Sequence, residues 1–234
     1  MKTLSFSHIG KRKVNQDFVL IEELGQGTQL ALIADGMGGY DHGDIAAKMV
    51  AENIMAFLST VHQIEPSGIQ MAVNKANLAV KQLKELHQTK LGATVAGIIL
   101  QGEKAICFWV GDVKIFHFKN LDLEWESTSH SLVNEVLSSG SIKDPKQIEK
   151  YRHVVTRSVQ GDIEKSIISS QIINDLTSSD QFIICSDGVS DYFEGLQIQQ
   201  LLKNSTSALK EIEDRLSIEA KDNFSLISLS NISQ

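Results

Sequence analysis

The chain has 234 residues, 42% of them hydrophobic, which is enough for a large domain with a full core. Its formal net charge of −7 argues against a nucleic acid or an anionic membrane as a partner. Only two prolines and no Gly/Ser-rich tract occur, so we expect a single domain over residues 1–234.

The cysteines and the N-terminus predict the compartment. Cys107 and Cys185 both lie inside apolar runs and lack CxxC spacing, so we expect buried cysteines in a reducing compartment. The first residues show no apolar leader-like segment, and no stretch is long enough to cross a bilayer. The sequence therefore predicts a cytoplasmic protein without a membrane partner.

The first part of the chain predicts one strand followed by two helices. The run over 29–34 is almost continuously apolar, as in a strand buried on both faces, and a glycine-rich turn ends it. Apolar residues then recur at helical spacing over 44–58 and again over 69–86. Each of these segments is expected to pack through one face.

The middle of the chain predicts short strands. We expect strands over 94–100, 105–110 and 114–118, joined by turns at 101–103 and 111–112. Because both connections are short, these strands are interpreted as a meander of antiparallel pairs.

The last part predicts short elements around a charged excursion of weak periodicity. They are a helix over 131–139 closed by Gly140, a mobile excursion over 141–162, a strand over 181–185, a helix over 196–202 and a closing strand over 224–229. Two blocks of strands with helix pairs between them predict an α+β fold, with two packed antiparallel β-sheets flanked by pairs of α-helices.

Aspartates in five short segments are the candidate functional residues: Asp17, Asp35, Asp112, Asp187 and Asp222. Most of them lie where an apolar run starts or stops, and a sheet gathers such positions at one edge. Clustered carboxylates need a partner that cancels their repulsion, and hard divalent cations do this best. Since no histidine or cysteine belongs to the set, the oxygen ligands favour Mg²⁺ or Mn²⁺ over Zn²⁺ or copper.

The same set favours phosphoryl chemistry. Two such ions sharing a carboxylate can hold a hydroxide between them and stabilise an in-line phosphoryl transfer. A phosphate ester would need one further cation, and Arg12 has the planar fork for it.

Other interpretations of these segments are weaker. Any single Asp-Gly pair is more often a turn than a ligand. A GxGxxG dinucleotide motif would need glycine where Asp41 stands, and no GxxxxGK[ST] motif is present. Ser186 is not in a GxSxG elbow, so a serine hydrolase is not predicted.

Short motifs follow one another over nearly the whole chain, from about residue 7 to residue 229. They are RxxNQD at 12–17, DGMGG at 35–39, Gly-Ala-Thr at 92–94, Gly-Asp-Val-Lys at 111–114, His-Ser-Leu-Val at 130–133, SDGxxD at 186–191 and Asp-Asn at 222–223. With these motifs in this order, the chain resembles the metal-dependent PP2C-type (PPM) serine/threonine protein phosphatases in their compact bacterial form.

The resemblance implies a function and a set of metal ligands. It implies hydrolysis of phosphoserine and phosphothreonine on proteins by a metal-bridged hydroxide that attacks phosphorus. Asp35 should bridge two Mn²⁺ or Mg²⁺ ions. Asp187 and Asp222 should hold the first ion and the carbonyl of Gly36 the second, while Asp17 should act through metal-bound water.

The resemblance also implies roles around this centre. Arg12 should bind the substrate phosphate, and Arg12 and Asp35 should together be the catalytic residues. Asp112 resembles a ligand of the third, weaker ion found in many members, together with Asp187 and Asp191. Residues 131–165 resemble the flap that covers the cleft, and a cognate serine/threonine kinase is the partner system that bacterial members often oppose.

The chain departs from the family at a few positions, and alternatives stay open. Lys114 stands where the family has arginine, Ser129 replaces an aspartate, and the general acid is not identified. A catalytically weak PP2C-like binding module is one alternative, although the expected ligands and Arg12 are all present. A phosphatase for small phosphate esters is another, because the same centre would recognise only the phosphoryl group.

Overall fold

The fold is described from a computed structural model. It describes residues 1–37, 42–139, 151 and 154–232. Gly140 and most of the excursion predicted over 141–162 lie outside the described residues.

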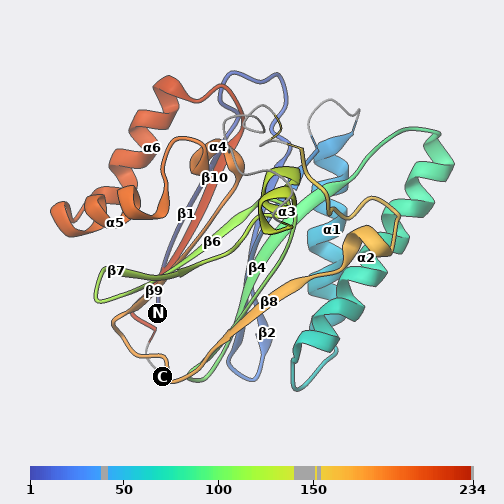
Figure 1. The fold of residues 1–234 in the computed structure, drawn as a ribbon. Helices are drawn as coiled ribbons and strands as arrows, with labels where there is room; N and C mark the ends of the chain where they lie inside the picture. Colours follow the sequence, from blue (N-terminus) through green and yellow to red (C-terminus); the bar gives the residue numbers. More distant parts are fainter. Residues whose placement is uncertain (38–41, 140–150, 152–153, 233–234) are drawn as a thin grey trace.

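Two five-stranded antiparallel sheets form the centre of the molecule (Figure 1). The first has the order β2 (Asp17–Gly25), β3 (Thr28–Gly36), β4 (Ala93–Gln101), β5 (Lys104–Val110) and β8 (Ser169–Ile173). The second has the order β1 (Lys2–His8), β10 (Phe224–Ser230), β9 (Asp180–Cys185), β6 (Lys114–Lys119) and β7 (Asp122–Glu126).

Helices cover the outer faces of both sheets, which confirms the predicted α-β-β-α sandwich (Figure 1). On the first sheet lie α1 (Gly43–Leu58) and α2 (Pro66–His87). On the second lie α4 (Asp187–Ser190), α5 (Gly195–Asn204) and α6 (Ala208–Glu219). The short helices α3 (Leu132–Ser138) and η3 (Glu164–Ser166) belong to the connection between β7 and β8.

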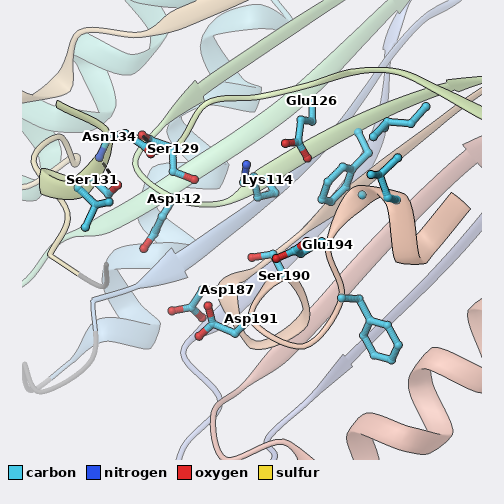
Figure 2. A pocket seen from close by; sticks show the side chains of 16 residues that line it. Asp112, Lys114, Glu126, Ser129, Ser131, Asn134, Asp187, Ser190, Asp191 and Glu194 are labelled. Atoms are coloured by element: carbon cyan, nitrogen blue, oxygen red, sulfur yellow. Dashed lines mark hydrogen bonds between the residues drawn. The ribbon is translucent and has the colours of Figure 1, made fainter. Parts of the chain in front are cut away.

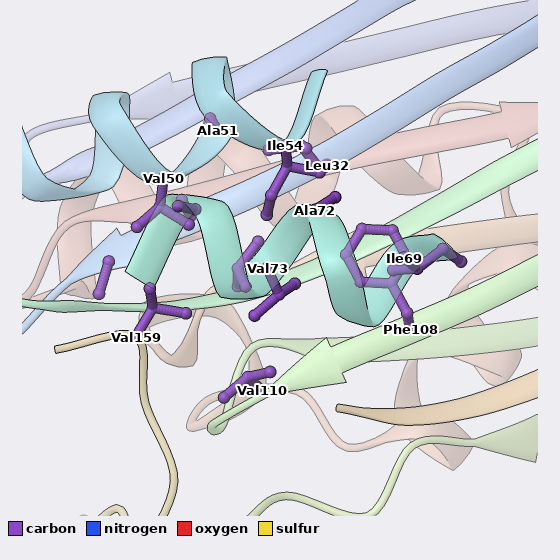
Figure 3. Close-up of a cluster of buried hydrophobic side chains, with 14 of the residues drawn as sticks. Leu32, Val50, Ala51, Ile54, Ile69, Ala72, Val73, Phe108, Val110 and Val159 are labelled. Atoms are coloured by element: carbon purple, nitrogen blue, oxygen red, sulfur yellow. The ribbon is translucent and has the colours of Figure 1, made fainter. Parts of the chain in front are cut away.

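Strand alternation explains why the core has separate layers. On β3, Leu32 packs toward α1 and α2, whereas its neighbour Ile33 packs between the two sheets. Figure 3 shows the helix-facing layer, where Ile54 of α1 and Val73 of α2 meet Leu32 and Phe108. Because both faces of β3 are covered, its sequence is continuously apolar rather than alternating.

The predicted meander is wrong at its second connection. β5 pairs with β4 and β8, and β6 pairs with β9 and β7, so the chain crosses from one sheet to the other at 111–112. A short connection usually makes a hairpin, but Gly111 has a φ of +110°. A Cβ at Gly111 would lie 2.3 Å from the side chain of Thr94, so only glycine fits this close crossing.

Several elements were not predicted. The edge strands β7 and β8 are short and largely exposed, so they carry little apolar pattern. The helix α6 is highly charged, and only Ala208, Ile212 and Leu216 are buried along it. Both cysteines are buried and unpaired. No helix in the described part of the chain is long and apolar enough to span a bilayer.

A buried hydrogen bond between His117 and Asp180 ties β6 to the start of β9. Nε2 of His117 lies 2.8 Å from Oδ1 of Asp180, and the Thr177 hydroxyl donates to Oδ2 at 2.8 Å. Burial alone would raise the pKa of Asp180, but the hydrogen bonds from Thr177 and His117 outweigh burial and lower it. Asp180 is therefore held as a carboxylate inside the protein.

Candidate metal centre

The antiparallel topology brings the predicted aspartates to one end of the sandwich. In the first sheet, Asp17 begins β2 and lies directly opposite Asp35 at the end of β3. Asp112 follows the end of β5, and its neighbour Gly111 packs on Thr94, the register partner of Asp35. In the second sheet, Asp187 comes two positions after the end of β9 and begins α4.

Asp222 completes this end from the start of β10. It precedes Phe224, the first residue of that strand, by two positions. Since β9 and β10 are antiparallel neighbours, the end of β9 and the start of β10 lie at the same end of the sheet. The pKa of Asp187 is raised, first by burial and then by the charges of Asp112 and Asp222. These carboxylates are therefore close enough to repel one another.

The glycine after each central aspartate permits close backbone packing. A Cβ at Gly36 would lie 2.2 Å from the carbonyl oxygen of Gly43, the first residue of α1. A Cβ at Gly188 would lie 1.9 Å from the carbonyl oxygen of Asn223. The Asp-Gly pairs thus let α1 and α4 begin directly against neighbouring segments at the acidic end.

Asp17 is buried, and among the described residues only one of its side-chain oxygens has a partner. The Ser186 hydroxyl donates to Oδ2 at 2.8 Å, and the backbone N–H of Ser225 donates to Oγ of Ser186 at 3.0 Å. Oδ1 is buried and has no hydrogen-bond partner among the described residues. Burial raises the pKa of Asp17 to about 6, although the serine hydrogen bonds oppose the shift.

Asp35 lies among several other carboxylates. Burial raises its pKa well above the ordinary value, and the charges of Asp17, Asp187 and Asp112 raise it further. Beside it, the hydroxyl of Thr94 is a second buried oxygen for which the described part of the structure provides no partner. An excess of buried oxygens without enough donors is the environment that a hard cation would satisfy.

The candidate ligands fit Mg²⁺ or Mn²⁺ by chemistry, but they do not form a complete cage. Within the described ranges, no three histidine, cysteine, aspartate or glutamate side chains are arranged as a finished metal-binding group. The expected set also includes a backbone carbonyl, that of Gly36, and Asp222 is engaged by another residue. The fit therefore rests on the oxygen donors and on the raised pKa values of Asp17, Asp35 and Asp187.

Arg12 is the residue that binds the carboxylate of Asp222. Its Nε donates to Oδ1 of Asp222 at 2.8 Å, and its Nη2 donates to Oδ2 at 2.5 Å. This bidentate contact raises the pKa of Arg12. The structure thus places the predicted phosphate-binding guanidinium at the acidic end, where its planar fork holds a carboxylate.

Asn223 fixes the loop that carries Arg12. Its Nδ2 donates to the carbonyls of Ile9 and Val14, and its Oδ1 accepts from the N–H of Gln16 at 2.9 Å. The side chain therefore holds both ends of the loop against the start of β10. From the sequence, Asn223 is named only as part of the Asp-Asn motif at 222–223, without a role in holding this loop.

His130 holds the crossing that carries Asp112. The N–H of Gly111 donates to Nδ1 of His130 at 3.0 Å, and the N–H of His130 donates to the Gly111 carbonyl at 2.8 Å. Nε2 therefore carries the proton of the neutral ring, and it lies 2.9 Å from Oγ of Ser169. Burial, followed by the charge of Arg157, lowers the pKa of His130 to about 4.

A cavity of about 490 Å³ opens beside the acidic end (Figure 2). Figure 2 shows Asp112, Asp187 and Asp191 at one side of it. The described part of the predicted flap contributes Ser131 and Asn134, from the start of α3. The residues predicted for a third ion are thus brought to one cavity.

Comparison with known proteins identifies the family. A family model described as protein phosphatase 2C matches residues 6–227. The chain belongs to the protein phosphatase 2C family.

Bacterial relatives match most of this chain. The serine/threonine phosphatase stp of Listeria monocytogenes serotype 4b is 24% identical over 201 residues, covering 82% of this chain and 79% of that protein. Protein phosphatase PhpP of Streptococcus pneumoniae serotype 2 is 25% identical over 199 residues, covering 82% of this chain and 80% of the relative.

Solved structures share the fold over nearly the whole chain. A bacterial serine phosphatase superposes with a TM-score of 0.85 at 21% identity, covering 100% of this chain and 99% of that one. The catalytic domain of the serine threonine protein phosphatase PstP in complex with 2 manganese ions has a TM-score of 0.78 at 20% identity, covering 97% and 96% of the two chains.

Proposed function

We propose that this chain is a metal-dependent serine/threonine protein phosphatase that hydrolyses phosphoserine and phosphothreonine on proteins. The observation that carries the proposal is the convergence of Asp17, Asp35 and Asp187, with raised pKa values, at one end of a protein phosphatase 2C fold. Stp and PhpP, which are named as phosphatases of this kind, support it.

The proposed ligand set uses oxygens from both sheets. Asp35 would contact two Mn²⁺ or Mg²⁺ ions, Asp187 and Asp222 would hold the first, and the carbonyl of Gly36 would hold the second. When bound, such ions supply an activated water and neutralise charge on the phosphoryl group. The PstP structure with 2 manganese ions supports the choice of metal and the number of ions.

The remaining side chains have separate roles in the proposal. Asp17 is oriented by Ser186 and, once ionised, can accept a hydrogen bond from the attacking water. Arg12 would bind the non-bridging phosphate oxygens with the fork that now holds Asp222. Asp112, Asp187 and Asp191 would hold a third ion beside the cavity.

Two further proposals concern the setting of the reaction. We propose that the phosphoprotein substrates come from a cognate serine/threonine kinase, and that the protein acts in the cytoplasm. The kinase is suggested by the family resemblance, and the compartment by the unpaired buried cysteines.

Hydrolysis of a phosphothreonine peptide in Mn²⁺ tests the proposal. We expect turnover that stops with excess EDTA and returns with Mn²⁺. A protein that binds the peptide without hydrolysing it would instead be a binding module. Faster hydrolysis of free phosphoserine or nucleotides than of the peptide would identify a phosphatase for small esters.

A further inference from the structure

The cavity beside the acidic end extends beyond the carboxylates proposed to hold the cations. Its wall continues away from Asp187 along β6 and β7 to the start of α5. The apolar part of this wall includes the buried rings of Phe116 and Phe193. Leu196 adds an aliphatic side chain that is 62% exposed.

Carboxylates line this second part of the cavity. Glu126 is the last residue of β7, and Glu194 is the N-cap of α5; Figure 2 shows both with Lys114 around the cavity. A Cβ at Gly195 would lie 3.0 Å from Oε2 of Glu126, so that carboxylate rests against the first turn of α5. The Lys114 ammonium donates to the carbonyl of Ser127 at 2.8 Å.

We infer that this part of the cavity binds an arginine or lysine side chain of the substrate, close in sequence to the phosphorylated residue. The inference rests on the proposed phosphatase function and adds a substrate preference to it. The occupant follows from charge complementarity and from continuity with the acidic end. A long basic side chain can lay its aliphatic stem on Phe193 and Leu196 while its cationic head meets Glu126.

The same wall disfavours other substrate segments. An acidic residue would face Glu126 and Glu194 and be repelled, and a small neutral residue would leave the apolar floor uncovered. The preference should therefore appear as a gain in kcat/KM from one well-placed basic residue. Glu194 also accepts from the N–H of Gln197 in a capping box, so Glu126 is the better residue to change.

The experiment is an arginine scan of a phosphothreonine peptide. Arginine replaces alanine at each position within about five residues of the phosphothreonine, because an extended chain covers about 3.4 Å per residue. Hydrolysis in Mn²⁺ is compared for wild type, Glu126→Lys and Glu124→Lys. Glu124 is the matched control, since it is an exposed glutamate of the same strand that does not line the cavity.

A second pair of variants tests the apolar floor. Leu196→Ala removes an exposed aliphatic side chain inside the cavity, and Ile218→Ala removes one that is 76% exposed on α6, outside the cavity. Hydrolysis of p-nitrophenyl phosphate, which has no flanking residues, reports the phosphatase centre separately.

We expect arginine at one or two positions to raise kcat/KM of the wild type by about fivefold, the effect of one partly exposed ion pair. Glu126→Lys should abolish the gain and Leu196→Ala should reduce it. The control variants should retain it, and all variants should hydrolyse p-nitrophenyl phosphate like the wild type.

A flat arginine scan, or an equal gain in Glu126→Lys, would overturn the inference while leaving the phosphatase proposal intact. Loss of hydrolysis of both peptide and p-nitrophenyl phosphate by the wild type in Mn²⁺ would overturn the proposed function, and the inference with it.

Discussion

Replacing Asp17 with asparagine should stabilise the protein when divalent cations are removed. The carboxylate is buried, its Oδ1 is an unsatisfied acceptor within the described chain, and burial raises its pKa from 3.8 to about 6. A difference of this size corresponds to about 3 kcal/mol of unfavourable free energy for the charged form in the folded protein. Asparagine removes the charge and retains an oxygen that can accept from Ser186.

The size of the effect depends on pH. Above about pH 6, Asp17 is charged in both the folded and the unfolded chain, so the full penalty destabilises the fold. Between about pH 6 and 3.8 the folded form takes up a proton that the unfolded form has lost, and the penalty shrinks. Below about pH 3.8 both forms are neutral and the advantage of Asp17→Asn should vanish.

Urea unfolding in EDTA measures this effect directly. At about pH 8 we expect Asp17→Asn to exceed the wild type by up to about 3 kcal/mol in free energy of unfolding, and at about pH 4.5 by much less. Glu124→Gln, on the exposed face of β7, is the control and should change little at either pH. A variant less stable than wild type by the same amount at both pH values would refute the reasoning, because favourable contacts would then outweigh the buried charge.

The other predictions concern turnover, the sheet crossing and the hydrogen bond between His117 and Asp180. Asp35→Asn should lose nearly all Mn²⁺-dependent phosphopeptide hydrolysis while staying folded by circular dichroism; hydrolysis at the wild-type rate would contradict its role. His130→Phe retains a ring but leaves the N–H of Gly111 without its acceptor, so urea unfolding should show a loss of about 1–3 kcal/mol in the free energy of unfolding. An unchanged free energy of unfolding would argue against a stabilising role of the hydrogen bond between His130 and Gly111. Asp180→Asn should cost about 1–3 kcal/mol at neutral pH. The carboxylate's contribution is present above its unfolded pKa of 3.8 and disappears as the pH falls through the lower folded value, so an equal loss at a pH far below 3.8 would contradict the lowered pKa.

Sequence patterns predicted the sandwich because most of its strands are buried on both faces. β3 and β4 are continuously apolar, and the apolar stripe of α1 is plain. The patterns were weak where burial is partial, as in β7 and β8, or where charges surround a narrow stripe, as in α6. The pattern of apolar residues therefore predicted most of the fold, whereas the edge elements are defined by tertiary contacts that the pattern does not show.

The acidic end was predictable as a group of residues and not as a geometry. Strand ends placed Asp17 and Asp35 together, but only the sheet register shows them directly opposite one another. The supporting contacts of Ser186, Asn223 and His130 join segments far apart in sequence, so no local spacing reveals them. A serine directly before the Asp187-Gly188 pair was the available signal for Ser186.

Crystals soaked in Mn²⁺ and measured at the manganese absorption edge test the central claim most directly. We predict anomalous peaks at the end of the sandwich, within coordination distance of Asp35 and Asp187, and their loss in Asp35→Asn. Peaks confined to other surfaces, or none at this end in a well-diffracting soaked crystal, would contradict the metal centre on which the proposed phosphatase depends.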